Sequence, residues 1–142
     1  MRSGDYMEKY DVKFKKKFGQ NFLKDINIVK KIVRCADIKE DSLVIEVGPG
    51  GAIMTRELAE AANNVVAYEI DTELEMELNK RLEGLSNVDI IFQDFLVSDL
   101  VEDVKKYNYK HLYFVSNVPY YITTPILMKI IESGLPFEKI VM

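Results

Sequence analysis

The stretch Leu43-Val44-Ile45-Glu46-Val47-Gly48-Pro49-Gly50-Gly51 indicates the fold class of this 142-residue chain. Its first five residues are mostly apolar and β-branched, as is typical of a buried strand. The glycine-rich segment that follows is typical of a tight turn. Residues 52–62 then have the composition of a helix. A strand, a glycine turn and a helix in this order predict the first unit of a parallel α/β sheet.

The same alternation continues along the chain. Helices are expected over about 26–36, 52–62, 72–82, 98–106 and 124–133, and strands over 43–47, 65–70, 88–92, 111–116 and from 138 onward. Asp25 and Thr72 are the expected N-caps of the first and third helices. We therefore expect a doubly wound α/β fold with a mainly parallel sheet and helices on both faces. The sequence stops within the fifth strand, so a sheet truncated in or after that strand is expected.

Composition places the chain among ordinary soluble proteins. It is 48% hydrophobic and 30% charged, and no apolar run approaches the roughly 20 residues of a membrane span. The charged N-terminus does not resemble a secretion signal, so a cytoplasmic protein is expected. Cys35 is the single cysteine and His111 the single histidine. An internal disulfide is therefore excluded, and no metal site is expected.

Charge is unevenly distributed along the chain. Up to Lys39 there are eleven basic and five acidic residues, and beyond it eight basic and eighteen acidic ones. We divide the chain into a disordered N-terminus (1–12), a basic arm with the first helix (13–39) and a core (40–142). Lys13, Lys15, Lys16 and Lys17 are interleaved with phenylalanines, a pattern that suits RNA phosphates. The alternative is a solvated basic tail.

The first strand and its glycine turn predict a nucleotide site. Glycine lets the backbone approach a ligand, and Gly48 and Gly50 precede the N-terminus of a helix. Glu69 follows Gly48 by 21 residues, where an acidic side chain can bind ribose hydroxyls. The dinucleotide fingerprint requires a further glycine at the position of Ile53, so this fingerprint fails. S-adenosylmethionine is therefore favoured over a nicotinamide dinucleotide, while plain turn glycines remain the structural alternative.

Two further strand ends carry polar residues. Asp94 follows the third strand, where it can accept from an adenine amino group or simply cap a loop. Asn117-Val118-Pro119-Tyr120 follows the fourth strand. The Asn117 amide oxygen and the carbonyl before Pro119 can both accept from an exocyclic NH2 group, and Tyr120 can stack on a base. This combination suits chemistry on the amino group of an unstacked nucleobase, although a strand-ending turn would use the same residue types.

Five motifs occur in an order that resembles a known family. They are Gln20-Asn21-Phe22-Leu23, Glu46-Val47-Gly48-Pro49-Gly50, Glu69-Ile70-Asp71, Gln93-Asp94-Phe95 and Asn117-Val118-Pro119-Tyr120-Tyr121-Ile122-Thr123-Thr124-Pro125. Together they resemble the ribosomal RNA adenine N6-dimethyltransferases, whose fold is the Rossmann-like S-adenosylmethionine-dependent methyltransferase type. The resemblance covers about Phe14 to Met142, and its last motif is more similar to the small-subunit enzyme than to the antibiotic-resistance methylases of large-subunit RNA.

The resemblance implies dimethylation of N6 on two adjacent adenosines near the 3′ end of small-subunit RNA, within ribosome biogenesis. It assigns Asn21 and Leu23 to the methionine end of S-adenosylmethionine and Asn117 to the same pocket. Residues assigned to the rest of the cofactor are Gly48 and Gly50 for the pocket floor, Glu69 for the ribose, and Ile70 and Asp94 for the adenine. It assigns Asn117 and the Pro119 carbonyl to the target N6, and Tyr120 to stacking on the flipped base.

The chain also departs from the family pattern. Ala52 stands where the family has a further glycine, which predicts an extra methyl group close to the cofactor pocket. The family's last strands and helical C-terminal domain are absent, so the chain is expected to be a monomeric cofactor-binding part with an open sheet edge that allows self-association. The alternatives are a large-subunit RNA methylase, a methyltransferase acting on DNA or a small molecule, and a ribosome-assembly factor that retains the fold.

Overall fold

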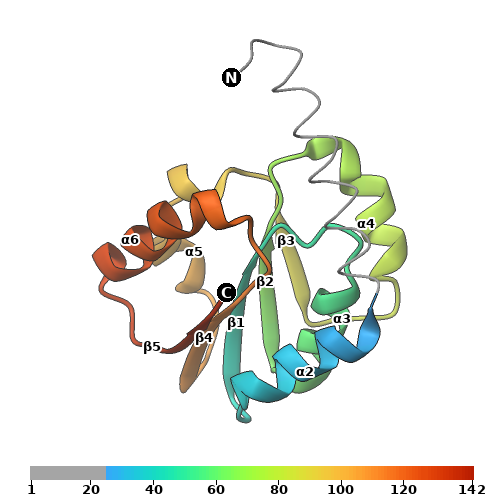
Figure 1. Cartoon of the computed structure of the whole chain (residues 1–142), viewed down its shortest axis with the longest axis horizontal. Helices are drawn as coiled ribbons and strands as arrows, with labels where there is room; N and C mark the ends of the chain where they lie inside the picture. The colour runs from blue at the N-terminus through green and yellow to red at the C-terminus, as the bar shows by residue number, and fades with distance from the viewer. Residues whose placement is uncertain (1–24) are drawn as a thin grey trace.

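The computed structural model describes residues 25–142, which form one sheet with helices on both sides (Figure 1). The strands are β1 (Ser42–Val47), β2 (Asn64–Tyr68), β3 (Val88–Ile91), β4 (His111–Val115) and β5 (Phe137–Val141). All neighbouring strands are parallel, and their order is β3-β2-β1-β4-β5. The predicted doubly wound α/β fold is confirmed.

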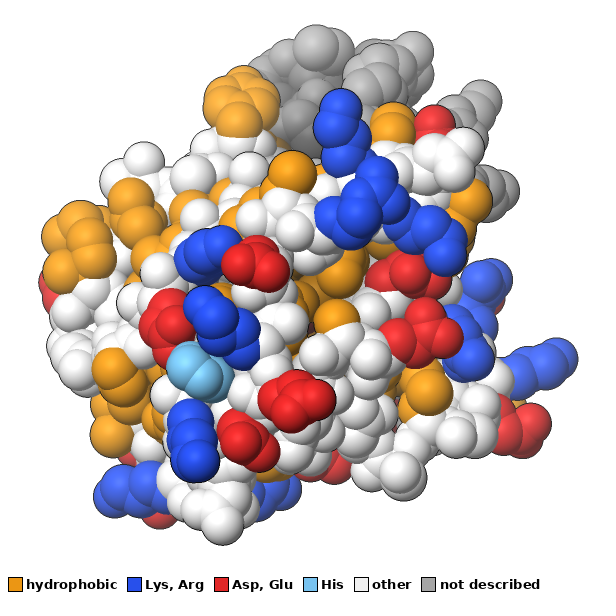
Figure 2. All heavy atoms as spheres, turned by 90° about the horizontal axis from the view of Figure 1, so that it is seen from below, with side chains coloured by type: hydrophobic (Ala, Val, Ile, Leu, Met, Phe, Trp, Pro, Cys, Tyr) orange, Lys and Arg blue, Asp and Glu red, His pale blue; other side chains and the backbone are white. Residues whose placement is uncertain are grey.

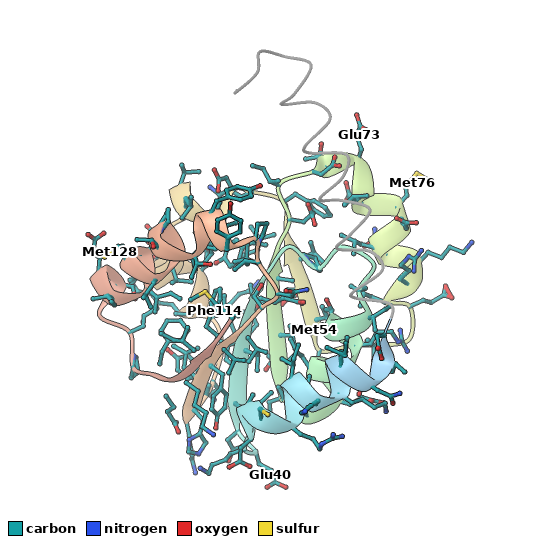
Figure 3. All side chains as sticks on the ribbon, in the orientation of Figure 1. Glu40, Met54, Glu73, Met76, Phe114 and Met128 are labelled. Carbon is teal, nitrogen blue, oxygen red and sulfur yellow. The ribbon has the colours of Figure 1, made fainter. Side chains whose placement is uncertain are left out.

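Helices cover the two faces of the sheet in two groups (Figure 1). They are α2 (Ile26–Ala36), α3 (Ile53–Ala61), α4 (Glu75–Arg81), α5 (Leu100–Val104) and α6 (Thr123–Ser133). One group is α2, α3 and α4, and the other is α5 and α6. Met54 packs in the core on the α3 side and Phe114 in the core on the α6 side (Figure 3). Both residues are fully buried, so each face of the sheet has its own apolar core.

Burial explains why the central strands are nearly continuous apolar runs. Strand β1 is buried along its first five positions and β4 along its last four, because each lies between two strands and under helices on both faces. Helix α2 adds Val29 and Ala36 to the same core as Met54, so this first helix packs on the folded body. Edge strand β5 is mostly exposed.

Helix starts differ from the sequence prediction at two places. Asp25 caps α2 as expected, since its carboxylate accepts from the backbone N–H groups of Asn27 and Ile28. Thr72 is not the cap of α4. Asp71 caps a short 3₁₀ turn, Thr72–Leu74, and α4 continues from that turn. The helix expected from residue 98 begins at Leu100 with Asp99 as its cap, and it is preceded by a second 3₁₀ turn, Phe95–Val97.

The two ends of the strands lie on opposite sides of the molecule. Glu40, just before β1, lies at the bottom of Figure 3, so the strands begin there and their carboxyl ends point upward. Seen from below, the lower edge carries Lys and Arg side chains beside Asp and Glu side chains (Figure 2). No helix within residues 25–142 is long and apolar enough to cross a membrane.

Candidate active site at the carboxyl edge of the sheet

A cavity of about 360 Å³ opens at the carboxyl ends of the strands. Its walls come from the segments that follow β1, β2, β3 and β4, together with the start of α6. The lining residues are Val47, Gly48, Tyr68, Glu69, Ile70, Gln93, Asp94, Phe95, Leu96, Asn117, Val118, Pro119, Ile122 and Ile126. Strand β1 has β2 on one side and β4 on the other, so the strand order reverses at β1. The cavity lies at this point, which is where open α/β sheets bind ligands.

The predicted strand-end residues meet at this cavity. Gly48, Glu69, Asp94 and Asn117 follow four different strands, and all four line it. They come together because parallel strands present their carboxyl ends at the same edge. Ile70 and Pro119, also predicted site residues, line the cavity as well.

Gly48 leaves the cavity open beside β1. Its φ is +74°, a left-handed conformation that favours glycine, and its N–H donates to the Tyr68 carbonyl at 2.8 Å. A Cβ at this position would meet no atom within 4 Å. The space that a side chain would occupy is therefore available to a ligand lying against the backbone.

Two carboxylates are held at fixed positions around the cavity. Glu69 is 6% exposed, and its Oε2 accepts from the N–H of Asp71 at 3.0 Å. Asp94 Oδ1 accepts from the N–H of Leu96 at 3.0 Å, which caps the 3₁₀ turn. Each carboxylate keeps further lone pairs for a ligand. Such groups accept hydrogen bonds from hydroxyl and amino groups, and they fit the ribose and adenine of an adenosine cofactor.

The segment after β4 presents acceptors and an exposed aromatic ring. The Pro119 carbonyl already accepts from the N–H of Ile122 at 3.2 Å and from the hydroxyl of Thr123 at 3.4 Å. Among the described residues, none donates a backbone hydrogen bond to the Val118 carbonyl, which therefore keeps both lone pairs for an incoming group. Tyr120 is 85% exposed and lies outside the cavity lining, in the 3₁₀ turn Tyr120–Ile122.

Ser116 joins the two strands that flank the cavity. Its hydroxyl donates to the Val47 carbonyl at 2.6 Å and accepts from the Val47 N–H at 3.1 Å. The backbone pairing of β1 with β4 ends at Ile45 and Phe114, so this side chain extends the pairing beyond the ladder. Sequence reasoning assigned Ser116 only to the end of a strand. The signal in the sequence is that Ser116 is a polar residue at the end of an apolar run, immediately before Asn117.

Glu46, inside the glycine motif, is a buried carboxyl group facing α3. It is 2% exposed, and the Thr55 hydroxyl donates to its Oε1 at 2.6 Å. Burial raises the pKa of Glu46 to about 8, the Thr55 hydrogen bond opposes this rise, and the nearby charge of Glu69 adds to it. A carboxyl group with this pKa is mostly protonated at pH 7. Glu46 is absent from the cavity lining, and its hydrogen bond with Thr55 joins β1 to α3.

Not every predicted site residue lies at the cavity. Gly50 has a φ of +53° but is absent from the lining. Ala52, which is expected to add a methyl group close to the pocket, is also absent from the lining and is fully buried against Leu78 and Leu82 of the α4 region. The predicted cofactor residues Asn21 and Leu23 and the predicted RNA-binding residues Lys13, Lys15, Lys16 and Lys17 lie outside the described residues.

Metal-binding side chains do not gather at this edge. Within residues 25–142, no three His, Cys, Asp or Glu side chains are placed so that they could hold a metal ion together.

Tyr68 OH donates to Asp103 at 2.8 Å, and burial together with this carboxylate raises the pKa of Tyr68 above its ordinary value. The Tyr68 hydroxyl is therefore a neutral donor held by Asp103.

Known proteins similar to this chain agree with the geometry. The family model described as ribosomal RNA adenine dimethylase matches residues 11–142. Ribosomal RNA small subunit methyltransferase A of Ligilactobacillus salivarius is 47% identical over 143 residues, which cover 99% of this chain and 48% of that protein. Its namesake in Streptococcus pneumoniae strain D39 is 45% identical over 149 residues, covering 99% and 51%. This chain thus spans about half the length of these relatives.

Solved structures point to the same group. The 23S rRNA methyltransferase ErmE has a TM-score of 0.64 at 32% identity, over 76% of this chain and 41% of that one. A dimethyladenosine transferase from Plasmodium falciparum also has a TM-score of 0.64, at 27% identity over 78% and 38%. The match of a family model to almost the entire sequence, together with these relatives, shows that the chain belongs to the ribosomal RNA adenine dimethylase family.

Proposed function

We propose that this chain is the cofactor-binding part of an enzyme that uses S-adenosylmethionine to dimethylate N6 of two adjacent adenosines near the 3′ end of small-subunit ribosomal RNA. The observation that carries the proposal is the meeting of Gly48, Glu69, Asp94 and Asn117 around one cavity. The relatives named small subunit methyltransferase A, at 45–47% identity, support the small-subunit target over the large-subunit one, because ErmE is 32% identical. Such an enzyme would meet the small ribosomal subunit in the cytoplasm.

The residues around the cavity can hold the cofactor by complementary chemistry. Glu69 would accept from the ribose hydroxyls, and Asp94 would accept from the adenine amino group. Ile70 is 68% exposed at the cavity wall, where its apolar side chain can cover one face of the adenine. The open space at Gly48 would admit the backbone-facing side of the ligand. Asn21 and Leu23 remain assigned to the methionine end by the family resemblance.

The chemistry requires a methyl donor and an aligned amino group. S-adenosylmethionine, when bound, supplies a methyl group on a positively charged sulfur. The amino nitrogen of adenine is a poor nucleophile because its lone pair is delocalised into the ring. The Asn117 amide oxygen would accept one of its N–H bonds. The Pro119 carbonyl, assigned by the family resemblance, or the Val118 carbonyl before it would accept the other, which favours a pyramidal nitrogen with a directed lone pair. Holding both reactants in this alignment lowers the entropic part of the barrier.

The target base would enter from the solvent side of the cavity. Tyr120 is exposed beside Pro119, and its ring offers a stacking surface to a base that has left its helix. Removing a base from the stack costs a few kcal/mol, which stacking on an aromatic ring offsets in part.

The proposed phosphate contacts of the arm are Lys13, Lys15, Lys16 and Lys17. The arm precedes the proposed methyltransferase core at 40–142.

A calorimetric titration with S-adenosylmethionine, with NAD as the control ligand, tests the cofactor assignment. We expect saturable binding of S-adenosylmethionine alone. Glu69→Gln should weaken this binding about tenfold or more, because a hydrogen bond to a charged group contributes roughly 1.5–3 kcal/mol. Glu73→Gln is the matched control, since Glu73 is exposed and points away from the body of the molecule (Figure 3). Binding of NAD, or equal effects of both substitutions, would contradict the proposal.

A further inference from the structure

One lysine of α6 is tied to the turn that carries Asp94. Lys129 Nζ donates to the Ser98 carbonyl at 2.6 Å and to the Leu96 carbonyl at 3.3 Å. The same ammonium group lies 5.7 Å from the ring centroid of Phe95. Lys129 is half-buried, in contrast to Lys105, which pairs with Glu102 at the surface. Charge-assisted hydrogen bonds of this kind are stronger than neutral ones.

The turn that Lys129 holds forms one wall of the cavity. Asp94, Phe95 and Leu96 all line the cavity, and Asp94 Oδ1 caps the turn through the N–H of Leu96. Phe95 is 3% exposed and packs edge to face on Tyr68 at 5.1 Å between ring centroids. Because the turn is only three residues long, few of its carbonyl groups accept hydrogen bonds from within the turn itself. Lys129 supplies partners from the neighbouring helix and so limits how far the turn can move.

Helix α6 also connects this turn to the other half of the site. It begins at Thr123, directly after the 3₁₀ turn that carries Tyr120, and Ile126 from its first turn lines the cavity. Lys129 lies one turn further along the same helix. The helix that follows the proposed target-base segment is therefore hydrogen-bonded to the proposed adenine-binding turn.

We propose that Lys129 is a positioning residue that holds Asp94 in the orientation required to accept from the 6-amino group of the cofactor's adenine. This inference rests on the proposed function, because it needs the adenosine cofactor in this cavity. A lysine that served only to stabilise the fold would affect every ligand of the cavity equally. A positioning role instead affects ligands that carry the amino group and spares those that lack it.

A pair of ligands that differ at one position separates these roles. S-adenosylhomocysteine carries an amino group at C6 of the base, and its analogue with unsubstituted purine as the base carries only a hydrogen there, which cannot donate to Asp94. We expect the unaltered chain to prefer the first ligand by about tenfold or more in calorimetry, as for other hydrogen bonds to a charged group. Lys129→Met should weaken the first ligand about fivefold or more and leave the second within about twofold.

Two companion variants complete the experiment. Lys129→Arg keeps the charge and the donors and should retain most of the preference. Lys105→Met removes a surface lysine and should leave both affinities unchanged. Circular dichroism of each variant establishes that it is folded. Equal weakening of both ligands by Lys129→Met, or an unchanged preference, would overturn the positioning role while the proposed function stands. Binding of neither ligand by the unaltered chain would overturn both.

Discussion

At the scale of single residues, Ala52 has an unusual backbone conformation. Its φ is +67° and its ψ is 13°, a left-handed conformation that costs a residue with a Cβ roughly 1–2 kcal/mol. The residue is nonetheless fully buried, and its N–H donates to the Pro49 carbonyl at 2.7 Å as the glycine turn enters α3. Its methyl group packs with Leu78 and Leu82, so the strain is offset by apolar contact.

These opposing terms predict that Ala52→Gly is nearly neutral for stability. Glycine relieves the left-handed strain, but it loses a buried methyl group worth about 0.8 kcal/mol and adds about 0.4–1 kcal/mol of unfolded-state entropy. Ala59→Gly is the matched control, because Ala59 is buried in the interior of the same helix without positive φ. There the change should cost about 2 kcal/mol. Urea unfolding measures both, and equal losses would show that position 52 carries no strain.

At the scale of elements, Ser116 holds β1 and β4 together where their ladder ends. Ser116→Ala would leave the N–H and the carbonyl of Val47 without the partner that now serves both. We expect a loss of about 1–3 kcal/mol in the free energy of unfolding, measured by urea titration. Ser42→Ala is the control, because its hydroxyl is also buried in β1 but has no partner among the described residues. That variant should be as stable as the unaltered chain or more stable. A similar loss of stability in both variants would contradict the proposed role of Ser116 in joining β1 to β4.

The strands could be predicted from sequence because burial leaves a simple pattern. β1 and β4 are buried on both faces, so they appear as continuous apolar runs and were located to within one residue. The helix starts were harder, since Asp71 and Thr72 are both good capping residues and adjacent. The structure uses Asp71, because its carboxylate reaches the Glu73 N–H at 3.0 Å in the 3₁₀ turn. Local propensity alone could not separate these two caps.

The site was predictable for a different reason than the strands. Gly48, Glu69, Asp94 and Asn117 could be grouped before any coordinates, because parallel topology brings strand ends to one edge. Lys129 and Thr55 could not be found in this way. Each acts on a partner that lies on a different element, and neither belongs to a motif at a strand end. Contacts between elements depend on helix placement, which the spacing of residues along the chain does not specify.

At the scale of the whole molecule, the buried Glu46 links stability to pH. Its pKa is about 8 in the folded chain and 4.5 at its ordinary value, so between these values the folded state holds a proton that the unfolded state has released. The contribution of this group to stability is therefore fully present below about pH 4.5 and is lost as pH rises toward 8. The slope is at most about 1.4 kcal/mol per pH unit.

Glu46→Gln tests this linkage, since an amide oxygen can still accept from Thr55 but does not ionise. The stability advantage of the variant over the unaltered chain should grow between pH 5.5 and pH 7.5, by about 2–3 kcal/mol in urea unfolding. Glu60→Gln, an exposed position on α3, should give a curve parallel to that of the unaltered chain. If the Glu46→Gln curve were parallel too, Glu46 would already be ionised in the folded state.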